Sequence, residues 1–459
     1  MSKQPNLIYV MADQLRHQSL GYTGDALAQT PFLDAFAAQS IDMCNAVSGH
    51  PVCAPYRASL FTGKYTPSTG MVINEIRLAT NHRCFGHVLN ESGYDTSYIG
   101  KWHLYANQVG NHYDAKNSFV PKGSDRLGFD DFFAAYNFHH EYYGAAAYYH
   151  LDTPEKIYCN GYEPDVQTDM AIERLKFHKS QDKPFALFLS LGTPHDPWEP
   201  WNVPGEYYER FNDTNFALPS NYKPDNDPYG DRWARLNENQ RNELTDWMRC
   251  YYAMTANLND NFGRLLQTVS SLELDNDTII VFTSDHGEMF GAQGRRGKNI
   301  FYEEAVRVPF LIRQPGGVAA GTKNDACLNA PDIMPTLLGL MNLPCPNEAE
   351  GVDVFANPPT GTLMMGTGAT AIYQDGHEWR AWRTRQFTYA TYLVDGATFL
   401  FDNINDPLQK VNLSGNSKYA QVEAEMKKNM ASEMHRIGDG FHPCSYYEKN
   451  RIADRIIQP

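Results

Sequence analysis

The chain has 459 residues, 54 of them acidic and 39 basic, which predicts one large α/β domain with a smaller appendage. Long basic tracts are absent from it, so nucleic acid is not an expected partner. We expect no membrane association and a cytoplasmic location, or a periplasmic one if a leader has been trimmed, because the sequence shows neither a membrane-spanning run nor a signal-peptide core.

The eight cysteines show no C-x-x-C spacing, which argues against a zinc ribbon or a disulfide framework. We expect them to be mainly reduced and buried. They are Cys44, Cys53, Cys84, Cys159, Cys250, Cys327, Cys345 and Cys444.

The first predicted element is a strand over residues 6–12, a continuous apolar run typical of a strand buried on both faces of a parallel sheet. Its carboxyl end delivers Asp13 and Gln14 to the place where open α/β sheets bind ligands. A helix is predicted to begin at Pro31, because apolar residues follow it at helical spacing.

The segment around Cys53 predicts a helix, since Pro55 is suited to a first turn and would place Cys53 at the N-terminus. Backbone N–H groups and the helix dipole favour a bound anion there, and Arg57 follows one turn later on the same face. Taken alone, the pattern is also typical of a buried cysteine before an ordinary helix, with Arg57 a solvated charge.

A helix over 82–91 and a strand over 94–100 are predicted next, and this strand leads into Lys101 and His103. Residues 105–165 are rich in aromatic residues, Gly, Asn and His without a clear period. We therefore expect long loops there that form a pocket wall.

A helix over 166–178 precedes a second buried strand over 185–191, which ends close to His195. Residues 197–235, full of Pro, Asn, Asp and Tyr, predict a second irregular insertion. The longest helix is predicted over 237–271, where apolar residues at helical spacing indicate packing rather than a cofactor site.

A strand over 278–283 delivers Asp285 and His286, and Lys298 lies beyond a glycine-containing loop. The remaining elements predicted in this part are a strand over 308–312 and a helix over 332–341.

The pattern changes near residue 361, where short strand-like runs alternate with turns before an amphipathic helix over 418–436. We predict a catalytic α/β domain over residues 1–360 and a C-terminal subdomain over 361–459, a small antiparallel sheet with one helix. The runs cover residues 363–365, 379–384, 387–393 and 398–401.

The string around Cys53 resembles the signature of the formylglycine-dependent type I sulfatases of the alkaline phosphatase superfamily. The polar pairs at the other strand ends have counterparts in that family in the same chain order, over roughly the first 340 residues. The resemblance implies an alkaline phosphatase-like fold, with a large, mostly parallel sheet flanked by helices and the smaller subdomain after it. The signature residues are Cys53, Pro55, Arg57, Leu60, Thr62 and Gly63.

The resemblance implies that Asp13, Gln14, Asp285 and His286 hold one divalent cation beside residue 53. The family often presents an oxygen-rich set suited to Ca²⁺, and we expect Ca²⁺. Gln14 and His286 depart from that set, as in some phosphonate monoester hydrolases and choline-sulfatase-like members. The imidazole therefore also admits Mg²⁺ or Mn²⁺.

The resemblance also implies that a maturation enzyme oxidises Cys53 to 3-oxoalanine (formylglycine), whose hydrate attacks the sulfur of a sulfate ester. A second hydroxyl of the hydrate then expels sulfate after His103 removes its proton. Arg57 and Lys101 are expected to hold the hydrate and its neighbours.

Lys298 and His195 are expected to bind the sulfate oxygens, with protonated His195 giving its proton to the leaving oxygen. Considered singly, His195 is also typical of a loop histidine and Lys298 of a solvated cation. Asn74 and His377 are predicted substrate-binding residues, the latter with Trp379 and Arg380 closing the pocket.

These features predict a sulfatase that acts on a sulfated sugar, a mono- or short oligosaccharide if the protein is intracellular. The alternative is a phosphonate monoester or phosphodiester hydrolase that uses the same site. A third hypothesis is an unmodified protein in which Cys53 stays a thiol and the pocket only binds anions.

Overall fold

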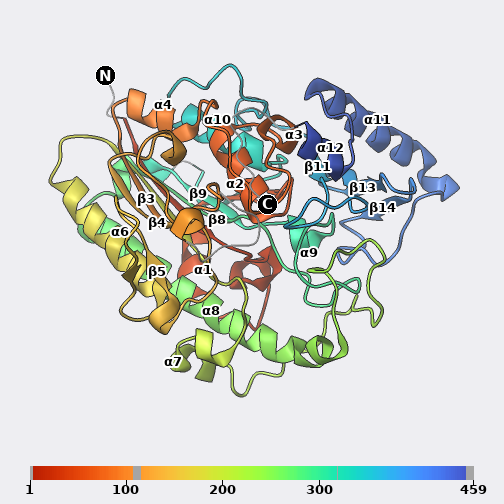
Figure 1. Ribbon diagram of the computed structural model, residues 1–459, viewed down its shortest axis with the longest axis horizontal. Coiled ribbons are helices and arrows are strands. Elements are labelled where there is room, and N and C mark those ends of the chain that lie inside the picture. Colours follow the sequence, from red (N-terminus) through yellow and green to blue (C-terminus); the bar gives the residue numbers. More distant parts are fainter. Residues whose placement is uncertain (1–3, 107–114, 318, 451–459) are drawn as a thin grey trace.

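A computed structural model describes residues 4–106, 115–317 and 319–450 of the protein. A β-sheet runs through the larger part of the molecule with helices on both faces, and a smaller sheet lies beside it near α11 (Figure 1). The helices are α1 (Pro31–Ala37), α2 (Cys53–Thr62), α3 (Thr66–Thr69), α4 (Phe85–Glu91), α5 (Ala115–Ser118), α6 (Glu163–Lys179), α7 (Gly205–Glu209), α8 (Glu238–Ser271), α9 (Glu303–Val306), α10 (Ala330–Leu340), α11 (Ala420–Arg436) and α12 (Cys444–Lys449).

Eight strands of the described chain form the large sheet, and seven of them run in one direction, since only β9 is antiparallel to its neighbours. The predicted, mostly parallel sheet with flanking helices is therefore confirmed. In spatial order the strands are β10 (Thr322–Asn324), β2 (Ile41–Met43), β9 (Phe310–Arg313), β8 (Thr278–Ser284), β1 (Asn6–Ala12), β7 (Phe185–Leu191), β3 (Asp95–Lys101) and β4 (Phe132–Tyr136).

The two faces of the central strand β1 pack into two different cores. Tyr9 and Met11 face a core shared with α2, α4 and α10, whereas Ile8 and Val10 face a core shared with α1, α6 and α8. All seven residues of β1 are buried, as the continuous apolar run predicted.

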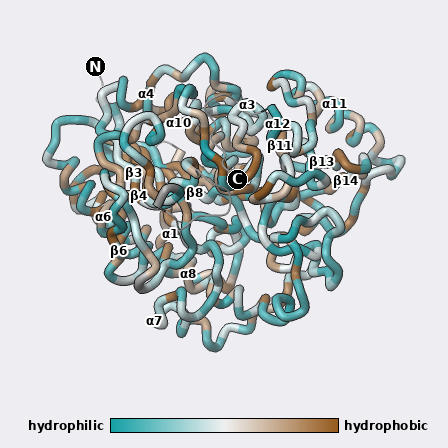
Figure 2. Tube along the Cα trace, in the orientation of Figure 1, coloured by the Kyte–Doolittle hydropathy of each residue, from teal (hydrophilic) through white to brown (hydrophobic). Residues whose placement is uncertain are grey.

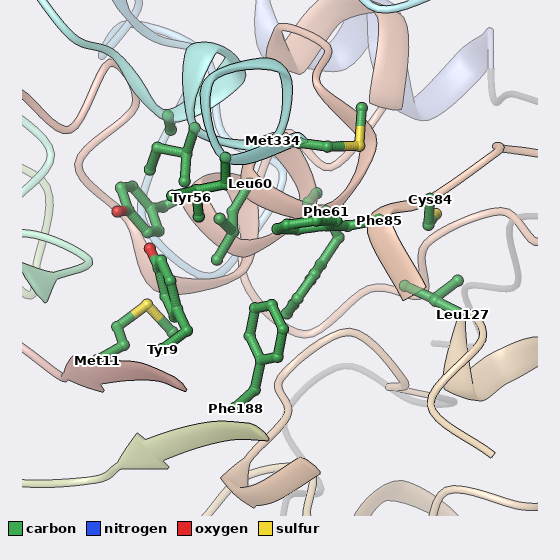
Figure 3. Close-up of a cluster of buried hydrophobic side chains, with 14 of the residues drawn as sticks. Tyr9, Met11, Tyr56, Leu60, Phe61, Cys84, Phe85, Leu127, Phe188 and Met334 are labelled. Atoms are coloured by element: carbon green, nitrogen blue, oxygen red, sulfur yellow. The ribbon is translucent and has the colours of Figure 1, made fainter. Parts of the chain in front are cut away.

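The core beneath α2 is densely aromatic. Figure 3 shows Phe61 of α2 and Met334 of α10 on the same side of the sheet as Tyr9 and Phe188. The Phe188 ring centroid lies 5.1 Å from that of Tyr9 and 5.9 Å from that of Phe61. Burial of each such side chain contributes about 1.5–3 kcal/mol, so α2 is firmly seated on the sheet.

The prediction of loops throughout 105–165 is wrong in one respect, because β4 lies within this segment and pairs with β3. A short hairpin of β5 (Tyr148–Tyr149) and β6 (Ile157–Tyr158) is also found there. The prediction for residues 107–114 lies outside the described residues. The three-residue strands β2 and β10 were not predicted at all.

The small sheet is antiparallel, and α11 packs against it, as predicted. Hydrophilic and hydrophobic residues alternate along α11 (Figure 2), and Met426 and Met430 are the buried ones. The boundary at residue 360 stays a prediction. The strands are β11 (Gly361–Gly366), β12 (Trp379–Thr384), β13 (Phe387–Tyr392) and β14 (Thr398–Asp402).

All eight cysteines are free, and six of them are buried; Cys44 is half-buried and Cys345 is exposed. Among the helices of the described residues, we find none with the length and apolar character needed to cross a bilayer.

Candidate active site

The ends of the neighbouring strands β1 and β8 bring two pairs of polar residues together. Ala12 and Ser284 are partners in the parallel ladder, so Asp13 and Asp285 leave the sheet side by side. The backbone N–H of Gln14 donates to Asp285 Oδ1 at 3.0 Å. Parallel strands thus place at one edge residues that lie far apart in the sequence.

Cys53 is the first residue of α2, at the helix N-terminus that the sequence predicted, and its side chain is fully buried. Its Sγ lies 3.2 Å from His286 Nε2, 3.6 Å from Asp13 Oδ1 and 3.8 Å from Lys101 Nζ. The predicted residues from four separate segments therefore meet at this one atom.

Arg57 binds the opposite side of the same cluster. Its Nη2 donates to Asp13 Oδ2 at 3.3 Å and to Asp285 Oδ2 at 3.2 Å. Its Nη1 donates to Lys101 O and Ser190 Oγ, both at 2.7 Å, and Lys101 Nζ lies 2.5 Å from Asp13 Oδ2. Each carboxylate is thus held by cations through Oδ2, which leaves Oδ1 directed to the other side.

The Oδ1 side of the cluster fits a divalent cation. One ligand atom from each of Asp13, Cys53, Asp285 and His286 lies within 4.8 Å of the others. His286 Nδ1 lies 3.0 Å from the carbonyl oxygen of Gly287, which can only accept, so Nδ1 carries the proton and the lone pair of Nε2 faces Cys53 Sγ. Carboxylate oxygens with one imidazole are ligands that Ca²⁺, Mg²⁺ or Mn²⁺ accept.

The protonation states agree with this fit. Burial lowers the pKa of His286 to about 4, so its imidazole is neutral at pH 7. Burial by itself would raise the pKa of Asp13, but the cations Lys101, Lys298 and Arg57 together bring it well below its ordinary value. Asp13 is therefore an ionised carboxylate.

Lys298 joins the cluster from the other side of Cys53. Its Nζ lies 3.2 Å from Cys53 Sγ, 2.9 Å from Gln14 Oε1 and 2.9 Å from His195 Nε2. Burial would lower the pKa of Lys298, but Cys53, Asp13 and Asp285 raise it, so the side chain is a cation. It lies where an anion attached to residue 53 would be bound.

His195 differs from the prediction in its protonation state. Burial, Lys298 and His140 lower its pKa well below the ordinary value, so the imidazole is neutral at pH 7 rather than protonated. Its Nδ1 lies 3.0 Å from the carbonyl oxygen of Asp196 and carries the proton. Nε2 therefore accepts a hydrogen bond from Lys298.

Glu288 is a site residue that the sequence reasoning missed. Its carboxylate accepts from Gln14 Nε2 at 2.6 Å, from Gly297 N at 2.7 Å and from Phe290 N at 3.0 Å. Gln14 is thus held between Glu288 and Lys298, in the left-handed region at φ 68°. Its role as a metal ligand stays a prediction. Only its position just after His286 could have suggested Glu288.

His103 lies in the same region, buried and also in the left-handed region at φ 57°. Its ring centroid is 4.5 Å from that of Phe138, and the Phe138 ring lies 5.0 Å from Lys101 Nζ. The Phe138 ring therefore lies in contact with both His103 and the charged cluster. The role of His103 as a base stays a prediction.

A cavity of about 290 Å³ opens beside Lys298 and His195. Phe138 and His140 from the segment 105–165 line its wall, as predicted, and the insertion over 197–235 contributes Trp198, Trp233 and Ala234. The lining residues are Gln14, Asn74, Glu75, Phe138, His140, His195, Asp196, Trp198, Trp233, Ala234, Glu288, Arg296, Gly297, Lys298, Thr370 and Ala371.

The two predicted substrate-binding residues have different positions. Asn74 lines the cavity, and its Oδ1 accepts from the backbone N–H of Ala54 at 3.0 Å, which caps the start of α2. His377 is not among the described residues that line it, and its Nδ1 bonds to the carbonyl oxygen of Tyr229 at 2.8 Å. The geometry does not support the prediction for His377.

Trp379 and Arg380 do not close the cavity either. Trp379 is buried and its Nε1 donates to the carbonyl oxygen of Asn299, while Arg380 is fully buried in an ion pair with Asp439. Trp379 thus ties the small sheet to the segment that carries Lys298, and Arg380 ties it to the chain that follows α11.

Two family models match the chain. Residues 5–343 match the model described as Sulfatase, and residues 291–436 match the one described as N-sulphoglucosamine sulphohydrolase, C-terminal. The first model covers well over half of the sequence.

Curated relatives match over almost the whole chain. An ulvan-active sulfatase from Formosa agariphila is 35% identical over 456 residues, which are 97% of this chain and 84% of that protein. An N-acetylglucosamine-6-O-sulfatase from Bacteroides thetaiotaomicron is 26% identical, over 93% of this chain and 85% of the relative.

A solved structure shows the same architecture. The Bacteroides fragilis protein assigned as the sulfatase yidJ superimposes with a TM-score of 0.82 at 28% identity, covering 97% of this chain and 99% of that one. With the signature helix, the buried polar cluster and these matches, the chain belongs to the formylglycine-dependent sulfatase family of the alkaline phosphatase superfamily and is a sulfuric ester hydrolase.

Proposed function

We propose that the protein hydrolyses a sulfate monoester of a carbohydrate, using a formylglycine at position 53 and one divalent cation. The observation that carries the proposal is the convergence of Asp13, Asp285, His286 and Lys298 on Cys53, next to the cavity that Lys298 lines. A thiol alone does not explain why so many charges surround this atom.

A hydrated aldehyde at position 53 would supply one hydroxyl group to attack the sulfur and a second to expel the sulfate afterwards. The cation would be held by Asp13, Asp285 and His286, with Gln14 as a predicted fourth residue, and it would make the attacking hydroxyl more acidic. We expect Ca²⁺, with Mg²⁺ or Mn²⁺ as alternatives.

Side chains of this chain would position residue 53, bind the sulfate and transfer the protons. Arg57 and Lys101 fix the two carboxylates and so hold residue 53 in place. Lys298 binds an oxygen of the sulfate, and its N–H bond to His195 Nε2 offers a path for the proton that the leaving oxygen needs. In the proposal, His103 removes the proton from the second hydroxyl.

The lining of the cavity supports a sugar as the leaving group. Phe138, Trp198 and Trp233 present aromatic side chains to it, and aromatic rings offer apolar surface to a sugar ring. A relative that acts on a sulfated N-acetylglucosamine agrees with this choice. Which hydroxyl carries the sulfate is a question for a panel of sulfated monosaccharides.

Maturation requires a second protein, a formylglycine-generating enzyme, to reach Cys53. Because the Cys53 side chain is fully buried in the folded chain, we propose that conversion precedes folding. Cys345 is exposed and offers a control thiol that should stay unmodified.

The test compares an aryl sulfate with an aryl phosphonate diester as substrates of the matured enzyme. We expect a higher kcat/KM for the sulfate, and a clear preference for the phosphonate would favour the alternative hydrolase. Mass analysis of the peptide that contains residue 53 should show the loss of sulfur and two hydrogen atoms and the gain of one oxygen. An unmodified thiol in an active sample would contradict the aldehyde.

A further inference from the structure

The cavity wall contains two cations, Lys298 and Arg296, which are two residues apart in the chain. Lys298 is engaged with Cys53, Gln14 and His195. Arg296 is half-buried and has no place in the proposed cleavage of the sulfate. Its presence in the lining therefore needs a separate explanation.

Arg296 is held in a fixed position by backbone atoms. Its N–H donates to the carbonyl oxygen of Ala234 and its Nε to that of Trp233, both at 2.9 Å. The Asp231 carboxylate fixes the same turn by accepting from the N–H groups of Trp233 and Ala234 at 3.0 Å. It also accepts from Thr370 N at 2.6 Å, on another part of the cavity wall.

No acidic side chain of the described chain lies within ion-pair distance of Arg296. Its neighbour Arg295 is buried and paired with Asp227 at 2.8 Å. Three carboxylates also line the cavity, those of Glu75, Asp196 and Glu288. Glu288 is engaged by three donors, and Asp196 lies 3.2 Å from His195 Nδ1. With Nε bound to a backbone oxygen, Arg296 has its two terminal nitrogens left to donate.

We infer that the substrate carries a second oxyanion besides the sulfate that is cleaved, a carboxylate or a further sulfate, and that Arg296 binds it. A guanidinium group recognises either oxyanion through paired N–H donors. The chain has a net charge of −15, which repels a polyanion. A fixed cation beside the cavity offsets this repulsion locally and favours an anionic substrate. The cavity is at the small end of ligand sites, so the second oxyanion belongs to the same sugar or to its direct neighbour.

This inference rests on the proposed sulfatase function, and the test separates the two. Matured wild-type enzyme is assayed with an aryl sulfate, a neutral monosaccharide bearing one sulfate, the same sugar bearing two, and a sulfated disaccharide containing a uronic acid. Arg296→Gln and Arg296→Lys are compared with Arg235→Gln. Arg235 is exposed, donates from Nε to the carbonyl oxygen of Gly230 at 3.0 Å on the same turn, and does not line the cavity.

We expect Arg296→Gln to lower kcat/KM by about 10- to 100-fold for the substrate whose second oxyanion Arg296 binds. Its kcat/KM for the singly charged substrates should change less than about threefold, and Arg296→Lys should retain part of the preference. In a Cys53→Ala background, which does not turn over, the same selective loss should appear in the Kd measured by calorimetry. Arg235→Gln should match wild type throughout.

An equal loss on singly and doubly charged substrates would overturn the inference, because it would indicate a structural or general catalytic role for Arg296. So would a wild-type enzyme that releases sulfate without preferring any doubly charged substrate. Failure of wild type to release sulfate from every substrate, the aryl sulfate included, would instead contradict the proposed function. The substrate that responds to Arg296→Gln identifies the oxyanion as carboxylate or sulfate.

Discussion

The buried charges beside the small sheet are paired one to one, whereas those at the ends of β1 and β8 share their partners. Arg380 meets Asp439 through two nitrogens, and Arg383 meets Glu303 at 2.7 and 2.9 Å. In these pairs both carboxylate oxygens are occupied. Such closed pairs leave no carboxylate oxygen for a bound cation.

The cluster at Cys53 is arranged differently. Arg57 contacts two carboxylates, and Asp13 Oδ2 has two cations, while the Oδ1 atoms of Asp13 and Asp285 face His286 and Cys53. The difference teaches that burial of charge alone does not indicate a site. Buried charges indicate a site when possible metal-ligand atoms, such as these two Oδ1 atoms, face one another and are not paired with a cation.

The largest expected effect follows from Asp13→Asn, which removes the charge that Lys101 and Arg57 hold beside residue 53. We expect kcat/KM for an aryl sulfate to fall by about 10³-fold or more, since a cation at the reacting centre is worth several kcal/mol. Steady-state kinetics on the folded, matured variant measures this. Activity within tenfold of wild type would show that Asp13 is not part of the reacting centre.

Asp439→Asn is the matched change in a closed pair and should affect stability instead. Leaving Arg380 buried without its carboxylate should lower the free energy of unfolding by about 3–5 kcal/mol. Denaturant unfolding measures the loss, and kcat/KM per folded molecule should stay near that of wild type. A large fall in kcat/KM with unchanged stability would contradict the distinction between a structural ion pair and the reacting cluster.

Adding the cation to metal-depleted protein should raise the Tm, because the ion binds only the folded cluster. At a concentration 100 times its Kd the gain is about 2.7 kcal/mol. Asp285→Asn should lose most of this gain, while Asp439→Asn should keep it. An equal rise in both variants would mean that the ion binds elsewhere.

The smallest effect concerns acid stability. Burial would raise the pKa of Asp439, but Arg380 lowers it below the ordinary value. Its contribution to stability is therefore complete above a pH of about 4, the ordinary carboxyl pKa, and is lost as the pH falls through the lowered one. Unfolding free energies measured down this range should fall less steeply for Asp439→Asn than for wild type. Parallel curves for the two proteins would contradict a lowered pKa of Asp439.

The sequence predicted best the parts of the fold that burial dictates. The runs that became β1 and β7 were predicted to the residue, because strands buried on both faces are apolar throughout. The three-residue strands β2 and β10 were not predicted, because so short a run has no recognisable period. Strand β4 was not predicted, because aromatic residues surround it in the sequence.

The candidate site followed a similar rule. Asp13 and Asp285 could be predicted since both follow buried strands whose carboxyl ends meet. Glu288 could not, because its contacts depend on how the loop after β8 folds back toward Gln14. The contact of His377 with Tyr229 could not be predicted, because it joins segments that no local pattern relates.

The most direct test of the shared cluster is the metal content of purified, matured protein, measured by elemental analysis together with the Asp13→Asn, Asp285→Asn and Asp439→Asn variants. We predict one divalent ion per chain in wild type and in Asp439→Asn, and much less than one in the other two. Undiminished metal in Asp13→Asn and Asp285→Asn, or none in an active wild-type sample, would contradict the account.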